Sequence, residues 1–473
     1  MRRVAIDRLT RVEGHGKVTI LLDDHNQVVQ ARLHIVEFRG FEMFVRGRPM
    51  REMPMIVQRL CGICPVSHHL GAAKATDMIV GADRLTPTAE KMRRLMHYGQ
   101  VYQSHALHFF HLASPDLLFG FDAPVAKRNV VGLAAAFPEL ARQAILMRRF
   151  GQEVIRATGG KRIHPQSAIP GGMNCNLAEA DRDQLRQGLD QQMEWAESAV
   201  RIARDYTLDH WAQLAHFAAF DSNHLCLTRA DGAMDLYDGN LCAVDAQGKT
   251  IFEDVDCHTY RDLLAEEVRD WSYLKFPFIK ALGPGKGWYR VGPLARLNVV
   301  HFIDTPLAER ARLEFRKLGD GRPVNATMAY HWARMIELLH AGEKMRELLF
   351  DPDLQGNDLL VSGPRRYEGI GVIEAPRGTL FHHYRVDDDD LITMVNLVVS
   401  TTSNNEAMNL AVADVARRHL SGVEITEALL NHIEVAVRAY DPCLSCGTHV
   451  LGQMGLEATL VGPDGQVLDQ KSR

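Results

Sequence analysis

The sequence of 473 residues carries 54 lysines and arginines against 59 aspartates and glutamates, which gives a formal net charge of −5. This balance gives no electrostatic reason to expect nucleic acid or an anionic membrane surface as a partner. Hydrophobic residues make up 46% of the chain, enough for a large core. No apolar run reaches the roughly 18 residues that predict a membrane-spanning helix.

The cysteine content and the first residues indicate a cellular compartment. The chain has eight cysteines, and no apolar export signal follows Met1-Arg2-Arg3. We therefore expect a cytoplasmic protein whose thiols stay reduced and are available for metal binding or catalysis.

The first predicted elements are a small sheet and a helix. Residues 4–36 alternate between apolar and polar side chains, which predicts a β-hairpin or small sheet with one solvated face. Pro65 follows Cys64, and proline is favoured in the first helical turn, so we expect a helix from Pro65 to about Val80. Cys64 would then lie at a helix N-terminus, where the helix dipole favours a thiolate, with His68 one turn further on the same face.

The rest of the chain is predicted to alternate between helical and extended regions. A long helix from Leu177 to about Leu214 is expected to be capped by Asn176, with Glu179 three residues on. Pro442 disfavours helix at Asp441, so Cys443 is expected in a loop. The other expected elements are helices over 86–158, short strands over 220–300, helices over 306–320 and 325–350, strands over 367–400, helices over 404–420 and 424–440, and a weak hairpin after residue 449.

These elements predict a mainly α fold with peripheral β structure (α+β): a core of long helices, an N-terminal hairpin or sheet and small mixed β regions. We expect one interwoven domain over residues 1–473, because cysteine motifs lie in both its first and its last core segment. Its predicted segments are 1–60 (N-terminal β region), 61–220 (helical core), 221–300 (strands and turns), 301–449 (helices and strands that close the site) and 450–473 (C-terminal extension).

Two C-x-x-C motifs, Cys61-Gly-Ile-Cys64 and Cys443-Leu-Ser-Cys446, together offer four thiolates to one metal site. A structural zinc site or an iron–sulfur cluster would use the same four ligands. Zinc ribbons, however, usually bring their cysteines from within a few tens of residues, and here almost the whole chain separates the motifs.

The residues beside the two motifs are compatible with metals other than a structural zinc ion. Proton-carrying side chains, which a closed structural site does not need, follow or flank both motifs at His68, His69, Asp441 and His449. Soft thiolate ligands also suit nickel and low-valent iron. From the residues alone, zinc, an iron–sulfur cluster and another metal all stay open.

Seven stretches, including both cysteine motifs, resemble the large subunits of nickel–iron hydrogenases. The resemblance covers essentially the whole chain and implies the fold of that family and its activity, the heterolytic cleavage of H2. Two further stretches, Trp271–Pro277 and Gly287–Ala295, resemble its cytoplasmic, bidirectional, NAD-linked branch. The seven stretches are Thr10–His15, Phe38–Glu42, Arg59–His68, His164–Gly172, Glu374–Gly378, Ser400–Asn404 and Asp441–His449.

The resemblance implies a Ni–Fe(CN)2(CO) centre held by the four cysteines. Cys61 and Cys443 would be terminal nickel ligands, and Cys64 and Cys446 would bridge nickel and iron. Cys443 would be the first proton acceptor and Glu13 the next proton carrier, although residue type alone favours a salt-bridged strand carboxylate for Glu13. H2 is a very weak acid, so its cleavage needs a Lewis acid and a base within bonding reach.

The resemblance also implies how an arginine would lie beside this centre. Arg377, which follows Pro376, would hold its guanidinium over the open face of the metals. Asp116 and Asp441 would anchor that guanidinium.

Four further residues match positions around the centre. His68 would donate a hydrogen bond to the sulfur of Cys64, and Ser400 would hydrogen-bond a cyanide. Glu42 and His449 match the ligands of a distant Mg²⁺ site near the C-terminus.

The expected partners follow from what the sequence lacks. It shows no further cysteine motif for an iron–sulfur cluster and no convincing nucleotide-binding glycine loop, so neither cluster nor flavin is expected in this chain. The resemblance therefore implies two partners: a diaphorase module that binds NAD(H) and flavin, and a small iron–sulfur subunit. NAD+ is the expected electron acceptor.

The resemblance also implies that the C-terminal extension is removed. The family trims its C-terminus just after the residue that matches His449, so residues 450–473 are the expected removable tail. A maturation endopeptidase and a metallocentre assembly chaperone would be transient partners. The alternatives are a large subunit of another cytoplasmic hydrogenase branch, a structural zinc protein, and a non-catalytic relative such as the quinone-site subunit of respiratory complex I.

Overall fold

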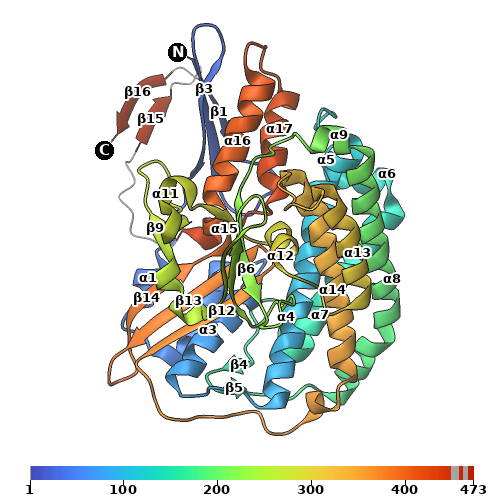
Figure 1. Ribbon diagram of the computed structural model, residues 1–473, viewed down its shortest axis with the longest axis vertical. Helices are drawn as coiled ribbons and strands as arrows, with labels where there is room; N and C mark the ends of the chain where they lie inside the picture. The colour runs from blue at the N-terminus through green and yellow to red at the C-terminus, as the bar shows by residue number, and fades with distance from the viewer. Residues whose placement is uncertain (1, 449–456, 462–466, 473) are drawn as a thin grey trace.

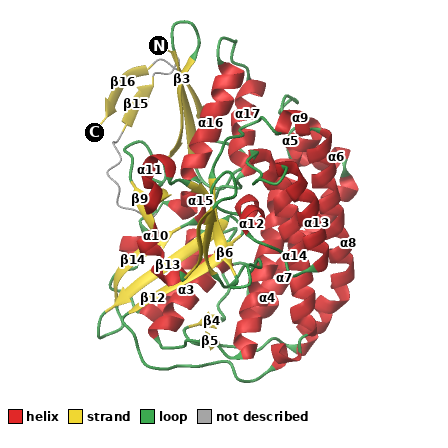
Figure 2. Ribbon diagram, in the orientation of Figure 1, coloured by secondary structure: helices red, strands yellow, loops and turns green. Residues whose placement is uncertain are grey.

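The computed structural model describes residues 2–448, 457–461 and 467–472. Most of the long helices gather on one side of the molecule and the larger sheets on the other (Figures 1 and 2). This arrangement confirms the predicted α+β fold with a core of long helices. Within the described ranges, no helix is both long and apolar enough to cross a lipid bilayer.

The long helices pack through apolar faces and small residues. In α8, apolar residues three or four positions apart are buried from Leu185 to Val200. Helices α4 and α7 approach closely because Gly99 and Gly151 face one another; a Cβ at Gly151 would lie 2.6 Å from the carbonyl oxygen of Gly99. The long helices are α3 (Pro65–Ile79), α4 (Pro87–Leu107), α7 (Pro138–Gly159), α8 (Glu179–Asp209) and α14 (Tyr330–Phe350).

Two details of these helices differ from the prediction. The N-cap of α8 is Ala178, and the amide of Asn176 instead donates to the carbonyl of Gly356 at 2.6 Å, because a contact from a distant segment competes for it. Helix α4 also continues into a π-helix, His108–Ala113, that hydrophobic periodicity gives no means of predicting. The shorter helices are α1 (Phe41–Phe44), α2 (Met53–Ile56), α5 (Ser114–Phe119), α6 (Val130–Ala136), α9 (Trp211–Leu214), α10 (Tyr260–Leu263), α11 (Gly283–Lys286), α12 (Pro293–Val299) and α13 (Pro306–Arg316).

The N-terminal residues form an antiparallel sheet of order β1-β2-β3, as predicted: β1 (Arg2–Asp7), β2 (Gly16–Leu22) and β3 (Val28–Ile35). It packs against α16 (Asn405–Leu420), where the side chain of Asn409 accepts a hydrogen bond from the backbone of Leu33 at 2.9 Å. Next to α16 lies α17 (Glu427–Ala439), which leads into the second cysteine motif. The fold therefore brings the two ends of the chain together.

A second antiparallel sheet carries the residues before and after Arg377. It consists of β12 (Glu368–Ala375), β13 (Gly378–Val386) and β14 (Ile392–Val398), and α15 (Ser400–Ser403) follows it. Helix α3 lies across β12 and β13 (Figure 1). This contact needs Gly371, because a Cβ there would lie 2.0 Å from the carbonyl oxygen of Gly71 in α3.

The middle of the chain forms short strands, as expected. The four-stranded sheet has the order β11-β6-β7-β8, and β9 pairs with β10. The C-terminal hairpin that the sequence predicts is present as β15 (Glu457–Val461) and β16 (Val467–Ser472), paired antiparallel. The remaining strands are β4 (Ala168–Ile169), β5 (Gly172–Met173), β6 (Asn223–Thr228), β7 (Asn240–Val244), β8 (Thr250–Val255), β9 (Leu264–Glu267), β10 (Phe276–Ile279) and β11 (Tyr289–Arg290).

Candidate metal centre

Four cysteines from opposite ends of the chain meet in the interior. Cys61 ends a short 3-10 turn, and Cys64 directly precedes Pro65 at the start of α3. Cys443 and Cys446 lie in the loop after α17, where a short 3-10 helix spans Leu444–Gly447. The predicted helix start and the predicted loop are both confirmed.

The four sulfur atoms are close enough to share one metal site. The Sγ–Sγ distances are 2.9 Å for Cys61–Cys64, 3.2 Å for Cys61–Cys443, 2.8 Å for Cys443–Cys446 and 3.7 Å for Cys64–Cys446. Two sulfur atoms that bind one ion at about 2.3 Å lie at most about 4.6 Å apart. All four side chains are buried. The geometry therefore fits a four-thiolate metal centre.

Electrostatics also favour a bound cation. Burial raises the pKa of the Cys443 and Cys446 thiols well above the usual value. Hydrogen bonds from Cys443, Cys446 and Cys61 lower the pKa of Cys64. Four thiolates in this buried volume would repel one another strongly, so the cluster can ionise fully only around a cation.

Glu13 lies directly against the second cysteine motif. Its Oε2 atom accepts hydrogen bonds from the Cys443 thiol at 3.0 Å and from the backbone N–H of Ser445 at 3.1 Å. The backbone carbonyl of Glu13 also accepts from the N–H of Leu444 at 3.0 Å. The N-terminal segment thus places a carboxylate within proton-transfer distance of a cysteine sulfur.

Arg377 lies in the turn between β12 and β13 and points into the centre. Its Nε donates to the carbonyl of Asp441 at 2.6 Å, and its Nη2 donates to Oδ1 of Asp441 at 2.9 Å. Burial alone would lower the pKa of Arg377, but Asp441 and the cysteine sulfurs raise it well above the usual value. The guanidinium therefore stays charged beside the thiols, held by Asp441.

Asp116 lies in a network of ion pairs with arginines other than Arg377. Within the described residues it does not contact Arg377; its carboxylate pairs with Arg11 at 2.6 Å and, at a short distance, with Arg438. The amide of Asn431 donates to the same carboxylate at 3.3 Å. Asp116 therefore ties the N-terminal segment to α17, which supports Glu13 and the second motif indirectly.

Of the other predicted residues, His68, Pro376 and Ser400 line a small cavity beside the sulfur atoms. Its volume is about 10 Å³, roughly the space that one water-sized molecule needs. Ser400 donates to the carbonyl of Gly378 at 2.7 Å, with its oxygen near the cavity. The lining residues are Cys64, Ser67, His68, Ala375, Pro376, Arg377, Leu380, Val399, Ser400, Thr401, Cys443 and Cys446.

Glu42 lies on α1, apart from the cysteines. Its Oε1 accepts from the backbone N–H of Leu397 at 2.9 Å, and the ammonium group of Lys275 is 4.0 Å away. Burial raises the pKa of Glu42. The predicted partner of Glu42 at a Mg²⁺ site, His449, lies outside the described residues.

Thr401, which contacts the second cysteine motif, was not predicted from the sequence. The hydroxyl of Thr401 accepts a hydrogen bond from the backbone N–H of Cys443 at 3.0 Å, which fixes the loop from the start of α15. Thr401 stands next to Ser400 in a matched stretch, but a run of hydroxyl residues gives no sign of which one reaches the loop.

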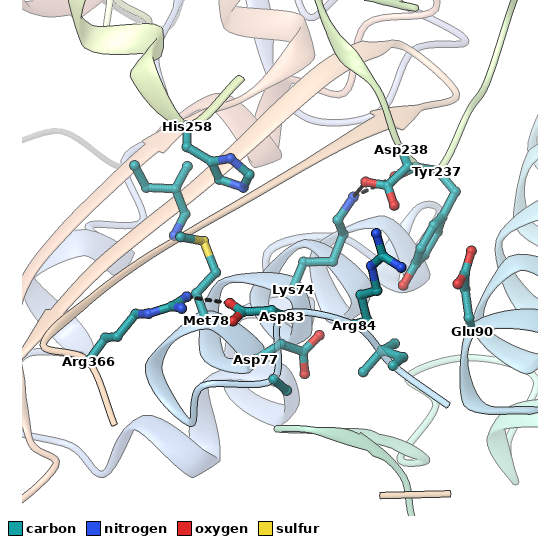
Figure 3. A pocket seen from close by; sticks show the side chains of 13 residues that line it. Lys74, Asp77, Met78, Asp83, Arg84, Glu90, Tyr237, Asp238, His258 and Arg366 are labelled. Carbon is teal, nitrogen blue, oxygen red and sulfur yellow. Dashed lines mark hydrogen bonds and ion pairs between the residues drawn. The ribbon is translucent and has the colours of Figure 1, made fainter. Parts of the chain in front are cut away.

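A larger pocket of about 730 Å³ opens near the C-terminal end of α3. Its charged side chains pair with one another, as Figure 3 shows: Lys74 with Asp238 and Arg366 with Asp83, both at 2.7 Å. Lys74 lies ten residues after Cys64 in the chain, so about 15 Å of helix separates this pocket from the cysteines. The pocket is therefore not part of the metal centre.

The described residues contain a second group with possible metal-ligand atoms, Asp256, Cys257 and His258. It lies in a single surface turn, where the carboxylate of Asp256 is occupied by the backbone N–H and the ring of His258, at 3.0 and 2.7 Å. The buried four-cysteine cluster is thus the stronger candidate.

Comparison with known proteins agrees with this geometry. The sequence models of two families match the chain: Nickel-dependent hydrogenase over residues 39–129 and 233–449, and HoxL-like over residues 3–38. The chain is 49% identical to the NAD-reducing hydrogenase HoxS subunit beta of Cupriavidus necator, over 100% of both chains. It is 41% identical to a subunit of the F420-non-reducing hydrogenase vhc of Methanococcus voltae, over 96% of both chains.

Solved structures give the same result. The crystal structure of an NAD+-reducing [NiFe]-hydrogenase in the H2-reduced state is 58% identical in sequence and superposes with a TM-score of 0.94, over 95% of this chain and 100% of that chain. The Ni-Fe-Se hydrogenase of D. vulgaris Hildenborough has the same fold at 24% identity, with a TM-score of 0.77 over 95% of this chain and 100% of that chain. The extent and identity of these matches show that the chain belongs to the family of nickel-dependent hydrogenases.

Proposed function

We propose that this chain is the catalytic large subunit of a nickel–iron hydrogenase that cleaves H2 heterolytically and reversibly, with NAD+ as the final electron acceptor. The observation that carries the proposal is the position of the Glu13 carboxylate, 3.0 Å from the sulfur of Cys443 inside a buried cluster of four cysteines. A structural metal site has no use for a proton acceptor at that distance.

The cysteine cluster suits a nickel–iron centre with carbon monoxide and cyanide on the iron. Cys61 and Cys443 would bind nickel alone, and Cys64 and Cys446 would bridge to the iron. When bound, such a centre supplies the Lewis acidity that polarises H2. The chain itself supplies four soft ligands and a buried cavity beside three of them, lined also by Arg377 and Ser400.

The proton would leave the cavity through residues of this chain. Cys443 would take it first, because its sulfur lines the cavity and already donates to Glu13. The carboxylate of Glu13 would take it next. Beyond it, the hydroxyl of Ser445 donates to Glu37 at 3.3 Å, so polar groups continue toward the surface.

Arg377 would place a fixed positive charge over the reacting atoms. Asp441 accepts two hydrogen bonds from one edge of the guanidinium, so the side chain has little freedom to move away. Pro376 fixes the backbone just before it, and the hydroxyl of Ser400 would turn from the carbonyl of Gly378 to donate to a cyanide. Asp116 would act at a distance, by holding Arg438 on α17.

A Mg²⁺ ion at Glu42 and His449 is also part of the proposal. A buried carboxylate whose pKa is raised by burial gains stability from a hard cation beside it. We further propose that residues 450–473 are removed by a maturation endopeptidase, after a metallocentre assembly chaperone has delivered the metals.

The proposed electron route requires a partner. Phe38, Met43 and Phe44 expose apolar side chains one to seven residues after Glu37 in the chain, where a protein partner would bury them. We propose that this surface binds a small iron–sulfur subunit, which passes electrons to a diaphorase module with flavin and NAD(H). The relative named as NAD-reducing supports NAD+ as acceptor. Because NAD+ is a cytoplasmic coenzyme, the proposal places the complex in the cytoplasm.

The test is to purify the complex anaerobically, measure its metals and assay it. We expect nickel and iron bound to the large subunit, infrared bands of bound carbon monoxide and cyanide, and H2-dependent reduction of NAD+. Zinc without nickel would show a structural site instead. Nickel and iron without NAD+ reduction, but with activity toward another acceptor, would place the chain in a different branch of the family.

A further inference from the structure

A row of three buried aromatic side chains leads from the metal centre into the second sheet. His68 lies on α3, and its Nδ1 is 3.1 Å from Nε2 of His382 on β13. Nδ1 of His382 is 2.6 Å from the hydroxyl of Tyr384. The three residues are almost completely buried. Hydrogen bonds within the row therefore satisfy polar atoms that are buried away from water.

The packing of helix on sheet builds this row. His382 and Tyr384 are two residues apart on β13, so both side chains project from the same face of the sheet. Helix α3 packs against β13, and Gly71 lies three residues after His68 on it. A Cβ at Gly71 would lie 2.8 Å from Cδ2 of His382, so glycine makes room for the ring.

The hydrogen bonds of this row all donate in one direction, from Tyr384 toward His68. The Tyr384 hydroxyl is hydrogen-bonded to His382 and to no other group among the residues that the structure describes. Its proton would be left unpaired unless it is donated to Nδ1 of His382, and a buried unpaired donor costs about 1 to 3 kcal/mol. Burial raises the pKa of Tyr384 well above the usual value, so the hydroxyl keeps its proton.

Each neutral imidazole carries one N–H and one acceptor nitrogen. If Nδ1 of His382 accepts, Nε2 of His382 must donate to Nδ1 of His68. Nε2 of His68 is then the ring nitrogen that carries the proton. His68 follows Cys64 by four residues, about one helical turn, and both residues line the same cavity.

We propose that Tyr384 and His382 are positioning residues that fix His68 in the tautomer that donates to the sulfur of Cys64. With the opposite tautomer, His68 would present a lone pair to a thiolate, and the two would repel. The donated hydrogen bond withdraws electron density from the sulfur of Cys64. Tyr384 therefore changes the electron density of this ligand through two intervening side chains, His382 and His68.

The first test uses the metal-free protein and does not depend on the proposed function. The chain is labelled with ¹⁵N-histidine, and the two ring nitrogens of His68 and His382 are assigned through His68→Gln and His382→Gln. Ring nitrogens with and without a proton differ clearly in chemical shift. We expect a protonated Nε2 and a bare Nδ1 in both residues. Tyr384→Phe should mix the tautomers of both rings, and Gly71→Ala should separate the rings.

The matched control is Tyr102→Phe. Tyr102 is also fully buried, but its hydroxyl donates to the carbonyl of Gln192 at 3.0 Å and touches no histidine of the row. This variant loses one buried hydrogen bond and should leave the ring nitrogens of His68 unchanged. Unchanged nitrogens in Tyr384→Phe, or a bare Nε2 of His68 in the unaltered protein, would overturn the proposal.

The second test uses the metal-loaded complex and rests on the proposed function. Loss of the hydrogen bond should raise the electron density on the Cys64 sulfur and on the iron. The infrared band of carbon monoxide should then shift to lower wavenumber in Tyr384→Phe, with the nickel content retained, and stay in place in Tyr102→Phe. An unchanged band in Tyr384→Phe contradicts the tuning role. Failure of the unaltered chain to bind nickel and iron would contradict the proposed function instead, and the nitrogen shifts would still decide the tautomer.

Discussion

The two cysteine motifs are held in different ways. The backbone N–H groups of Ile63 and Cys64 donate to the sulfur of Cys61 at 3.2 and 3.0 Å, so the first motif folds around its own cysteine at the start of α3. The second motif depends on distant residues. Thr401 accepts from the N–H of Cys443, and the segment around Glu13 holds the loop from the other end of the chain.

This difference indicates an order of assembly. Local contacts form at a small entropic cost, whereas contacts between chain ends form only after most of the chain is in place. The first motif can therefore be ready early, and the second should close last. The proposed removable tail follows directly after the second motif, which is where a delay in closure would leave time for metals to enter.

The largest expected effect is the loss of a sulfur from the second motif. Cys443→Ser replaces a soft ligand that is also the proposed first proton acceptor, so nickel binding and H2/D⁺ exchange should both be lost. Nickel is measured by elemental analysis, and exchange by mass spectrometry. Cys175→Ser is the control, because Cys175 is exposed and remote from the cluster. Normal nickel content with full exchange in Cys443→Ser would refute the assignment.

A smaller loss is expected when only the proton acceptor is changed. Glu13→Gln keeps an oxygen that can accept from Ser445, so nickel should stay bound. An amide cannot take up the proton, and turnover should fall by about 10²- to 10⁴-fold. Turnover is measured as H2 oxidation at equal nickel content.

The control for this prediction is Glu179→Gln, at an exposed glutamate in the first turn of α8. It should turn over normally. A Glu13→Gln variant with unchanged turnover would show that protons leave by another route.

The contrast between the local contacts of the first motif and the long-range contacts of the second explains which features the sequence could predict. Cys61, Cys64 and Pro65 are neighbours, so their helix start followed from local rules. The contact between Glu13 and Cys443 came only from the resemblance to a family, because no local pattern links residues at opposite ends of a chain.

The ion pairs of Asp116 could not be predicted for the same physical reason. Long arginine side chains reach Asp116 from three separate segments, at Arg11, Arg128 and Arg438. The spacing of these residues in the sequence does not indicate which guanidinium group pairs with the carboxylate of Asp116. The row from His68 to Tyr384 was missed because His382 and Tyr384 look like ordinary residues of a buried strand.

Thr401→Val should weaken the second motif without removing a ligand. It leaves the N–H of Cys443 buried without an acceptor, which costs about 1 to 3 kcal/mol. If the loop is needed for metal binding, nickel affinity should fall by about 5- to 150-fold, as that free energy implies. Thr401→Ser keeps the hydroxyl and should bind nickel normally. Equal nickel affinity in both variants would mean that the loop is held mainly by Glu13.

The smallest expected effect is on the unfolding free energy. It comes from His69, next to the first motif, and it depends on pH. His69 on α3 donates from Nδ1 to the carbonyl of Pro54 at 2.7 Å and accepts from the N–H of Ala168 at 3.1 Å. Burial lowers its pKa to about 4. The unfolded chain takes up this proton near pH 6.5 and the folded chain only near 4, so stability is full above 6.5 and falls toward 4.

Between pH 7 and 5, this single group should cost about 2 kcal/mol of unfolding free energy. His69→Gln keeps both hydrogen bonds but cannot be protonated, so its unfolding free energy, measured in urea, should fall by about 2 kcal/mol less over that range. His25→Gln, in an exposed turn, should behave like the unaltered chain. If His69→Gln and His25→Gln lose stability equally on acidification, water reaches His69 in the folded chain, and the first motif is less rigidly enclosed than its contacts indicate.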